Sequence, residues 1–298
     1  ECGFMDGDKN PSIWDAETGS VTSPGIYTQQ NGTTWLPVTL RPKQSLFYVF
    51  TAGAGLKRHI QTIQEQAGHT LFPSADEHVG VSPVANLGAT GQLTISDPQG
   101  GTYRMSANEG KLIDVNLKPA QNVIITTASD IQLESEPAVK VTDKQLRSLT
   151  DAAEPAIKYY SGVARYTIDV DIPALFFGTD KIIQLRIPRF GAAASIMCND
   201  KPAGDIWEPN FPVNITSLTH PGKNTLVIRA VNPWRNRIIG DFVHPRGDKN
   251  LFTTSTLQAV NDPAAIPVID KTSKLLSSGL SVPIEISSYE QTDLTNKL

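Results

Sequence analysis

The first candidates for chemistry are two acidic side chains on either side of a tryptophan. Asp205 and Glu208 flank Trp207. Hydrolysis of a glycosidic bond requires two carboxyl groups beside the bond, and an indole ring offers an apolar face on which a sugar can stack. Both acids, however, fall on a loop expected within a β-sandwich. We therefore interpret them as solvated loop charges and not as a catalytic pair.

A denser group of tryptophan, arginine, asparagine and aspartate side chains lies around the same region. One hypothesis is a carbohydrate platform, in which an aromatic face lies under a sugar ring and polar groups bond its hydroxyls. The other is structural: Arg237 pairs with Asp241, and Trp234 packs at a sandwich edge or against a neighbouring domain. We favour contact with another domain. The group consists of Trp207, Trp234, Arg235, Asn236, Arg237 and Asp241.

Two further patterns do not indicate a metal or nucleotide site. Asp76, Glu77 and His78 are adjacent, so neighbouring side chains on a strand point to opposite faces, and no second cluster completes a metal shell. Gly53-Ala54-Gly55 lacks the third glycine of a dinucleotide-binding loop, and no βαβ pattern follows it. No GxSxG nucleophile motif occurs in the chain.

The remaining tryptophans and the cysteines are assigned structural roles. Trp14 and Trp35 are expected to anchor the first sandwich, with a sugar contact as the alternative. Cys2 and Cys198 fit no metal spacing and no CxxC motif, and we expect two buried free thiols.

The composition is that of a globular chain with many short strands. Of its 298 residues, 39% are hydrophobic and 19% charged, with 22 Gly and 21 Pro. Few charges and many turn-forming residues favour strands joined by turns over long charged helices. The net charge is −4 and the basic residues are scattered, so nucleic acid is not an expected partner. The apolar runs fall far short of the ~20 residues that a membrane-spanning helix needs.

The periodicity predicts an all-β chain of two antiparallel sandwiches. In the second half Ala164, Tyr166, Ile168 and Val170 alternate with polar residues, as on a half-buried strand. In the first half Leu56, Ile60, Ile63 and Ala67 have a helical spacing, which predicts one helix there. The expected organisation is a β-sandwich at 1–135, a linker at 136–157, and a jelly roll with a C-terminal extension at 158–298.

Several strings in the second half resemble the galactose-binding-like jelly roll attached to many glycoside hydrolases. Residues 198–204 are similar to a "VNGKxVG" hairpin, 207–216 to "WxPPYxxDIT" and 220–226 to "LKPGxNTL". Residues 232–241 resemble "NxWxNRLIGD", 278–284 resemble "SGLLGPV", and 11–19 resemble "PELWDPxTG". Together these strings resemble the α-L-rhamnosidases of glycoside hydrolase family 106, in the region that follows the catalytic barrel.

The resemblance implies a non-catalytic accessory region. The acid and base of that family lie in the barrel, so no catalytic residue is carried over to this chain, and Asn214 replaces the aspartate of "DIT". It implies a periplasmic or extracellular location, the upstream barrel of the same protein as partner, and carbohydrate as a further one. Related jelly rolls often hold a structural calcium ion, but no ligand set is identified here, and no other cofactor is expected.

Two alternatives stay open. The chain could act as a free-standing carbohydrate-binding protein without catalysis, or as a small hydrolase whose site has no familiar motif. Residues 1–4 read as the middle of a strand, which predicts that the chain is part of a longer protein.

Overall fold

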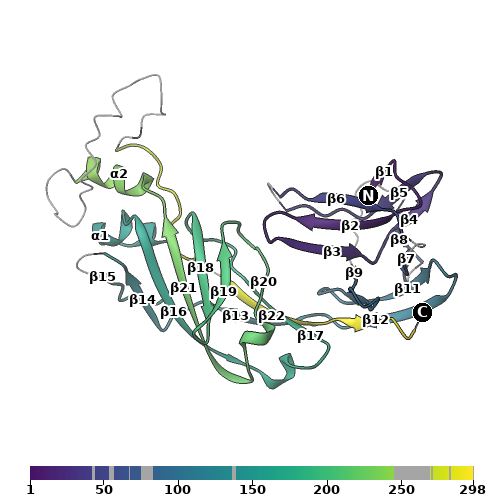
Figure 1. Ribbon diagram of the computed structural model, residues 1–298. Helices are drawn as coiled ribbons and strands as arrows, with labels where there is room; N and C mark the ends of the chain where they lie inside the picture. The colour runs from purple at the N-terminus through teal and green to yellow at the C-terminus, as the bar shows by residue number, and fades with distance from the viewer. Residues whose placement is uncertain are drawn as a thin grey trace. The chain divides into compact units, whose positions relative to one another are not determined.

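The computed structural model describes residues 1–41, 44–53, 57–66, 68–74, 83–135, 139–244, 269, 271–281 and 283–297. Their regular secondary structure is mostly β-strand, with only short helices (Figure 1), which confirms the all-β class expected from the sequence. The chain forms two compact units. Unit 1 comprises Glu1–Gln121, Gly178–Ile182 and Ser288–Leu298, and unit 2 comprises Asn122–Phe177 and Ile183–Ser287.

Unit 1 contains three antiparallel sheets. Their strand orders are β1-β5-β4, β23-β10-β9-β3-β2-β6 and β12-β11-β7-β8. Ile63, Leu93 and Met105 are fully buried in its core. The strands are β1 (Cys2–Phe4), β2 (Asn10–Asp15), β3 (Ser20–Pro24), β4 (Thr28–Gln30), β5 (Thr33–Leu36), β6 (Phe47–Thr51), β7 (Ile60–Glu65), β8 (Thr70–Phe72), β9 (Val84–Leu87), β10 (Leu93–Ser96), β11 (Gly101–Ala107), β12 (Leu112–Leu117) and β23 (Thr292–Asp293).

Unit 2 is built on two sheets, ordered β13-β22-β17-β20 and β15-β14-β16-β21-β18-β19. The alternation expected along β16 is confirmed, because Ala164, Tyr166 and Ile168 are buried. The strands are β13 (Gln121–Ile125), β14 (Asp130–Leu133), β15 (Val139–Lys140), β16 (Gly162–Ile172), β17 (Lys181–Arg186), β18 (Ala193–Cys198), β19 (Lys201–Ile206), β20 (Val213–Asn214), β21 (Gly222–Asn232) and β22 (Ile284–Glu290). The helices are α1 (Pro155–Lys158), α2 (Arg235–Val243) and the short 3-10 turns η1 (Leu149–Asp151), η2 (Ala174–Phe176) and η3 (Thr216–Leu218).

The helix predicted around residues 56–67 is wrong, because Ile60–Glu65 form strand β7. Ile60 pairs with Ala107 and Thr62 with Ser106, so the register shifts by one residue at this point. Such a bulge inserts one extra residue and turns the following side chains to the other face. Ile60 and Ile63 are therefore both fully buried although they are three residues apart, a spacing that resembles a helix.

The two units divide the chain differently from the boundary expected at 136–157. Strand β14 belongs to unit 2, where Ile131 pairs with Tyr166 of β16. The last residues return to unit 1, where β23 pairs with β10 and Leu294 is fully buried. These pairings join segments that are far apart in sequence, so local patterns give no signal for them.

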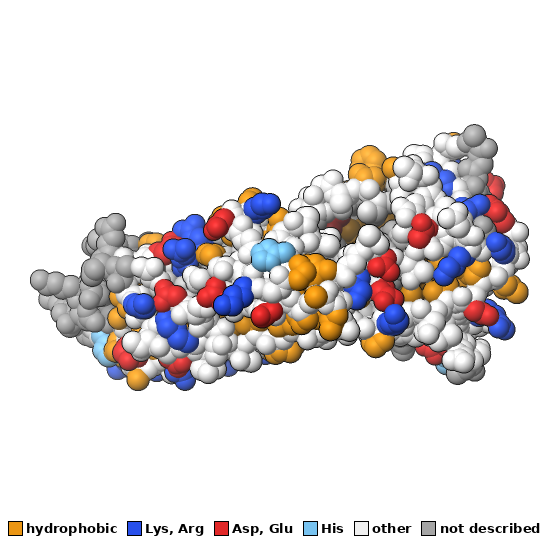
Figure 2. Space-filling view, turned by 90° about the horizontal axis from the view of Figure 1, so that it is seen from below, with side chains coloured by type: hydrophobic (Ala, Val, Ile, Leu, Met, Phe, Trp, Pro, Cys, Tyr) orange, Lys and Arg blue, Asp and Glu red, His pale blue; other side chains and the backbone are white. Residues whose placement is uncertain are grey.

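Acidic and basic side chains are interspersed over the face displayed in Figure 2. This distribution agrees with the scattered charges of the sequence.

Candidate functional site

The group from Trp234 to Asp241 lies on helix α2, which follows β21 directly (Figure 1). No helix was predicted for this stretch. Trp234 is the N-terminal cap residue, and the buried residues Asn236, Ile239 and Gly240 form the inner face of the helix. Ile239 and Gly240 follow Asn236 by three and four residues, which is a helical spacing. The helix is too short for this period to repeat in the sequence.

Asn236 holds a distant backbone segment in place. Its Nδ2 donates to the carbonyl of Leu276 at 2.7 Å, and its Oδ1 accepts from the Leu276 amide at 2.8 Å. Arg235 Nε donates to the carbonyl of Lys274 at 3.1 Å. Asn236 is fully buried, so both hydrogen bonds are shielded from water. The side chains of α2 thus clamp residues 274–276.

A second set of bonds extends this clamp to residues 278–280. Asn232 Oδ1 accepts from the Gly279 amide at 2.6 Å, and its Nδ2 donates to the carbonyl of Gly162 at 3.1 Å. The Leu280 amide donates to the Tyr166 hydroxyl at 3.1 Å, and burial raises the pKa of Tyr166 to about 12. The strings at 232–241 and 278–284 therefore bind each other, and their first role is structural.

Arg237 and Asp241 form the ion pair expected from the sequence. Arg237 Nε lies 3.4 Å from Asp241 Oδ1, one helical turn away, and both side chains are about nine-tenths buried. Gly240 lies against Tyr159, where a Cβ would come within 2.6 Å of that side chain. The contact of Gly240 with Tyr159 packs α2 against the rest of unit 2. The ion pair lies within the helix and is mostly buried, so neither charge is presented at the surface for a sugar.

Two tryptophans of the group are exposed, Trp207 by 57% and Trp234 by 58%. The strand register brings them to the same end of the six-stranded sheet of unit 2, β15-β14-β16-β21-β18-β19. Ile206 at the end of β19 pairs with Ala194, which pairs with Ala230 near the end of β21. An exposed tryptophan keeps a large apolar surface in water, so these two rings are the part of the group available for an external contact.

The pair of acids beside Trp207 is not arranged as a catalytic pair. Asp205 lies within β19, not on the expected loop, and it is exposed opposite Ser195. Glu208 lies beyond the end of the strand and is partly buried. A glycosidase acid needs a raised pKa. Among the described residues, hydrogen bonds from neighbouring side chains are the main cause of the clear shifts in carboxyl pKa, and all of these shifts are downward. The carboxyl groups concerned are those of Asp114, Asp130, Glu134, Asp169 and Asp293.

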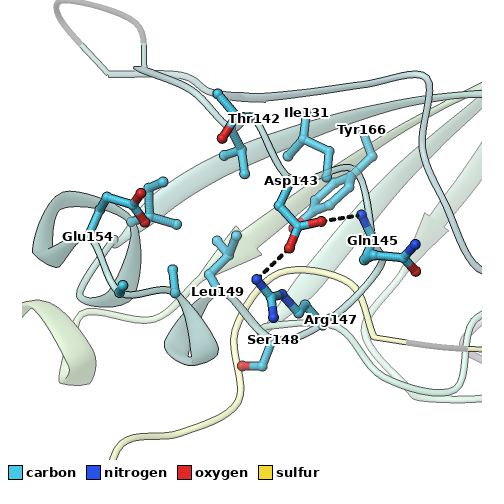
Figure 3. A pocket seen from close by; sticks show the side chains of 13 residues that line it. Ile131, Thr142, Asp143, Gln145, Arg147, Ser148, Leu149, Glu154 and Tyr166 are labelled. Carbon is cyan, nitrogen blue, oxygen red and sulfur yellow. Dashed lines mark hydrogen bonds and ion pairs between the residues drawn. The ribbon is translucent and has the colours of Figure 1, made fainter.

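A small hollow of about 210 Å³ lies beside β14, η1 and α1 (Figure 3). Ile131, Leu149 and Tyr166 contribute apolar surface to it. At its rim Asp143 accepts a hydrogen bond from the Gln145 amide at 3.0 Å and forms an ion pair with Arg147. Both oxygens of this carboxylate therefore interact with neighbouring residues, and we assign Asp143 a structural role.

Sequence reasoning missed a second structural cluster, at the hairpin between β18 and β19. Asn199 Nδ2 donates to the carbonyl of Leu218 and to Asn224 Oδ1, both at 2.8 Å. Asn224 Nδ2 donates to the carbonyls of His220 and Gly222. The signal was the Asn199-Asp200 pair, since asparagine and aspartate tolerate the positive φ that both adopt here. The strings at 198–204 and 220–226 are therefore joined by these amides.

The tryptophans of unit 1 do not anchor its core. Trp14 is 46% exposed, and its Nε1 donates to Ser12 Oγ at 3.0 Å. Val21 and Phe47, its neighbours on β3 and β6, are also exposed. Trp35 is 40% exposed and its ring covers Gly3 on the paired strand.

The two thiols differ from expectation, because Cys2 is exposed and only Cys198 is buried. Burial raises the pKa of Cys198 to about 11.

Asp76, Glu77 and His78 lie outside the described residues, as do Ala54 and Gly55. Within the described residues, no group of three or more His, Cys, Asp or Glu side chains could hold a metal ion. No helix among them has the length and apolarity to cross a membrane.

Comparison with known proteins relates the chain to part of longer enzymes. No known family profile matches it. It is 27% identical over 219 residues to a protein of Formosa agariphila named "Putative beta-glucuronidase", covering 68% of this chain and 19% of that protein. A rhamnosidase structure from Novosphingobium sp. PP1Y matches 96% of this chain and 21% of its own, with a TM-score of 0.61 and 20% identity.

The chain spans about a fifth of the length of both proteins. At 20% identity the likeness to the rhamnosidase shows the fold, which is that of a β-rich segment of the enzyme. Both proteins carry names of glycoside hydrolases, so the chain is related to a region of that class of protein.

Proposed function

We propose that this chain is a non-catalytic accessory region of a rhamnosidase-like glycoside hydrolase. The observation that carries the proposal is the fold match over 96% of the chain to 21% of a rhamnosidase. The motif at 278–284, together with that at 232–241, supports the assignment to the family 106 type, with a galactose-binding-like jelly roll as unit 2. The parent protein would act outside the cytoplasm, in the periplasm or beyond the cell.

Within this role the chain supports the catalytic barrel and contacts carbohydrate. Asn232, Asn236, Arg237 and Asp241 are used within unit 2, as their hydrogen bonds and the ion pair indicate. Trp207 and Trp234 are the members of the group that are left exposed. The two residues that follow Trp234 hold residues 274–276 through hydrogen bonds, so the backbone that carries the ring is anchored, as a domain contact or a sugar platform requires.

Hydrolysis assays test the absence of catalysis. The purified chain is expected to release no nitrophenol from p-nitrophenyl α-L-rhamnopyranoside or from p-nitrophenyl β-D-glucuronide above the buffer blank. The opposite result would be a nitrophenol-releasing activity that copurifies with the chain and is lost in Asp205→Asn or Glu208→Gln. That result would establish a small hydrolase and overturn the proposal.

A second experiment separates the two roles of Trp234. If the ring serves a domain interface, Trp234→Ala weakens assembly of the chain with the catalytic barrel and leaves glycan binding by the isolated chain unchanged. Trp14→Ala is the matched control, since that ring is similarly exposed but lies in unit 1. Loss of glycan binding in Trp234→Ala, with the fold intact, would assign the ring to carbohydrate.

The alternative is a free-standing carbohydrate-binding protein. Exposed Trp207 and Trp234 favour it equally, because sugar stacking needs no barrel. Retention of full glycan affinity by the isolated chain, with no measurable association with a barrel, would support this alternative.

A further inference from the structure

We propose that the outer face of the six-stranded sheet in unit 2 binds an anionic glycan. This proposal rests on the carbohydrate contact proposed above and adds the chemical class of the sugar. The site is a single row of polar and charged side chains that crosses the sheet from edge to edge. We call it the cross-strand row, and it consists of Lys140, Gln132, Arg165, Arg229, Ser195 and Asp205.

The strand register defines this row without a gap. Lys140 pairs with Gln132, and Gln132 pairs with Arg165. Arg229 lies opposite Arg165 on one side and Ser195 on the other, and Ser195 pairs with Asp205. Directly paired residues share one face of a sheet. The buried side chains of β16 and β21 alternate with Arg165 and Arg229, so the row faces away from the core.

The centre of the row holds two arginines in direct opposition. Like charges at directly paired positions destabilise a sheet, so this arrangement opposes folding. Glu134 forms hydrogen bonds with only one of them: it accepts from Arg229 Nε at 2.9 Å and from its terminal nitrogen at 2.5 Å. These hydrogen bonds, and to a smaller extent the charge of Arg165, lower the pKa of Glu134. Within the described residues the side chain of Arg165 makes no hydrogen bond or ion pair, although its backbone pairs with β14 and β21. Its guanidinium is therefore available to an external anion.

The chemistry of this centre selects a carboxylate or sulfate group. A guanidinium presents a planar fork of donors that matches two oxygens of either group. Gln132 and Ser195 beside the arginines offer donors and acceptors for sugar hydroxyls. At about 4.8 Å per strand, the row is about 24 Å long, which suits an extended chain better than a single sugar.

An apolar row runs beside the cross-strand row and completes the match to a sugar. Val163 pairs with Val231, and Val231 pairs with Ala193 on the same face. Val231 is 41% exposed. Trp207 lies at the edge of this face, because Ile206 before it is buried and Asp205 points outward. A pyranose has polar edges and apolar faces, which these two parallel rows can meet together.

The same surface is poorly suited to nucleic acid. Glu134 and Asp205 place negative charge on or next to the row, and the whole chain carries a net charge of −4. These acids repel an anionic glycan as well, but a glycan also offers hydroxyls to Gln132 and Ser195 and the flat faces of its rings to the apolar row. Nucleic-acid binding depends mainly on a concentrated stretch of positive charge, which the described residues of this face lack. A glycan is therefore the expected ligand of this surface.

The test compares charged and neutral polymers by titration calorimetry on the full chain. The probes are polygalacturonate, which carries carboxylates, dextran sulfate, which carries sulfates, neutral dextran, and a single-stranded DNA oligonucleotide. The wild type should bind at least one charged glycan about tenfold more tightly than dextran, and Arg165→Ala should remove about tenfold of that affinity. Which of the two polymers binds distinguishes the carboxylate from the sulfate.

Arg104→Ala is the matched control, because Arg104 is also an exposed strand arginine but lies in unit 1 and pairs with Asp114. It should bind as the wild type does, and Arg165→Ala should melt no lower than the wild type. Equal affinity for charged and neutral glycans overturns this inference and leaves the proposed function standing. Binding of none of these polymers also overturns this inference, while the proposed function is tested separately by the hydrolysis and assembly experiments described above. Tighter binding of DNA than of either charged glycan overturns the assignment to a sugar.

Discussion

Replacement of Asn236 by alanine tests whether α2 clamps the segment at 274–276. The change removes two hydrogen bonds to Leu276, at 2.7 and 2.8 Å, from a fully buried side chain. A neutral hydrogen bond contributes about 0.5–1.5 kcal/mol net, and an unpaired buried group costs about 1–3 kcal/mol. The Leu276 side chain is 47% exposed, so water can reach part of the freed backbone. We expect a loss of about 2–3 kcal/mol.

The assay is urea unfolding followed by tryptophan fluorescence, with hydrogen exchange of the Leu276 amide as a local measure. Asn236→Ala should lower the unfolding free energy and speed exchange at that amide. Asn116→Ala, an exposed position on β12, should do neither. Asn236→Asp retains an acceptor for the amide but faces the Leu276 carbonyl with a carboxylate, so it should also destabilise. A change below about 0.5 kcal/mol in Asn236→Ala, with unaltered exchange, would refute the clamp.

Three further predictions concern the core and the thiols. Gly279 has a φ of 70°, and a Cβ there would lie 2.2 Å from the Tyr166 hydroxyl. Gly279→Ala should therefore lower the free energy of unfolding in urea by more than about 2 kcal/mol. The control Gly110→Ala should lower it by about 1 kcal/mol, because Gly110 also has a positive φ, 82°, but has no atom within 4 Å of its Cβ position. Burial lowers the pKa of His59, whose Nδ1 donates to the Lys57 carbonyl and whose Nε2 has no hydrogen-bond partner among the described residues. The folded state therefore binds fewer protons than the unfolded state. The unfolding free energy should therefore fall as the pH drops below 6.5, and His59→Gln should flatten that slope. A thiol reagent should modify Cys2 in the native protein and Cys198 only after unfolding, and rapid native reaction of both would contradict the assigned burial.

The fold class followed from the sequence where side chains alternate simply. Strands β16 and β21 bury every second residue over most of their length, so their period of two was visible. Strand β7 was taken for a helix because its bulge gives two buried isoleucines a spacing of three. The division into units could not be predicted, because β23 pairs with β10 across about 200 residues of sequence.

The candidate site was found by composition, but its roles required the structure. The strings at 232–241 and 278–284 were both singled out, yet nothing in either indicates that Asn236 bonds Leu276 forty residues away. The cross-strand row was not anticipated at all. Arg165 and Arg229 lie on strands whose register is set by their full-length pairing, and only that register places the two charges opposite each other.

The central claim is that this chain contacts carbohydrate through exposed side chains and performs no catalysis. Its most direct test is calorimetric titration of the chain with a rhamnose-containing oligosaccharide, comparing the wild type with Trp207→Ala. We expect measurable binding by the wild type that weakens at least about tenfold in the variant, with an unchanged melting temperature. Equal binding by both proteins, or hydrolysis of the oligosaccharide during the titration, would contradict it.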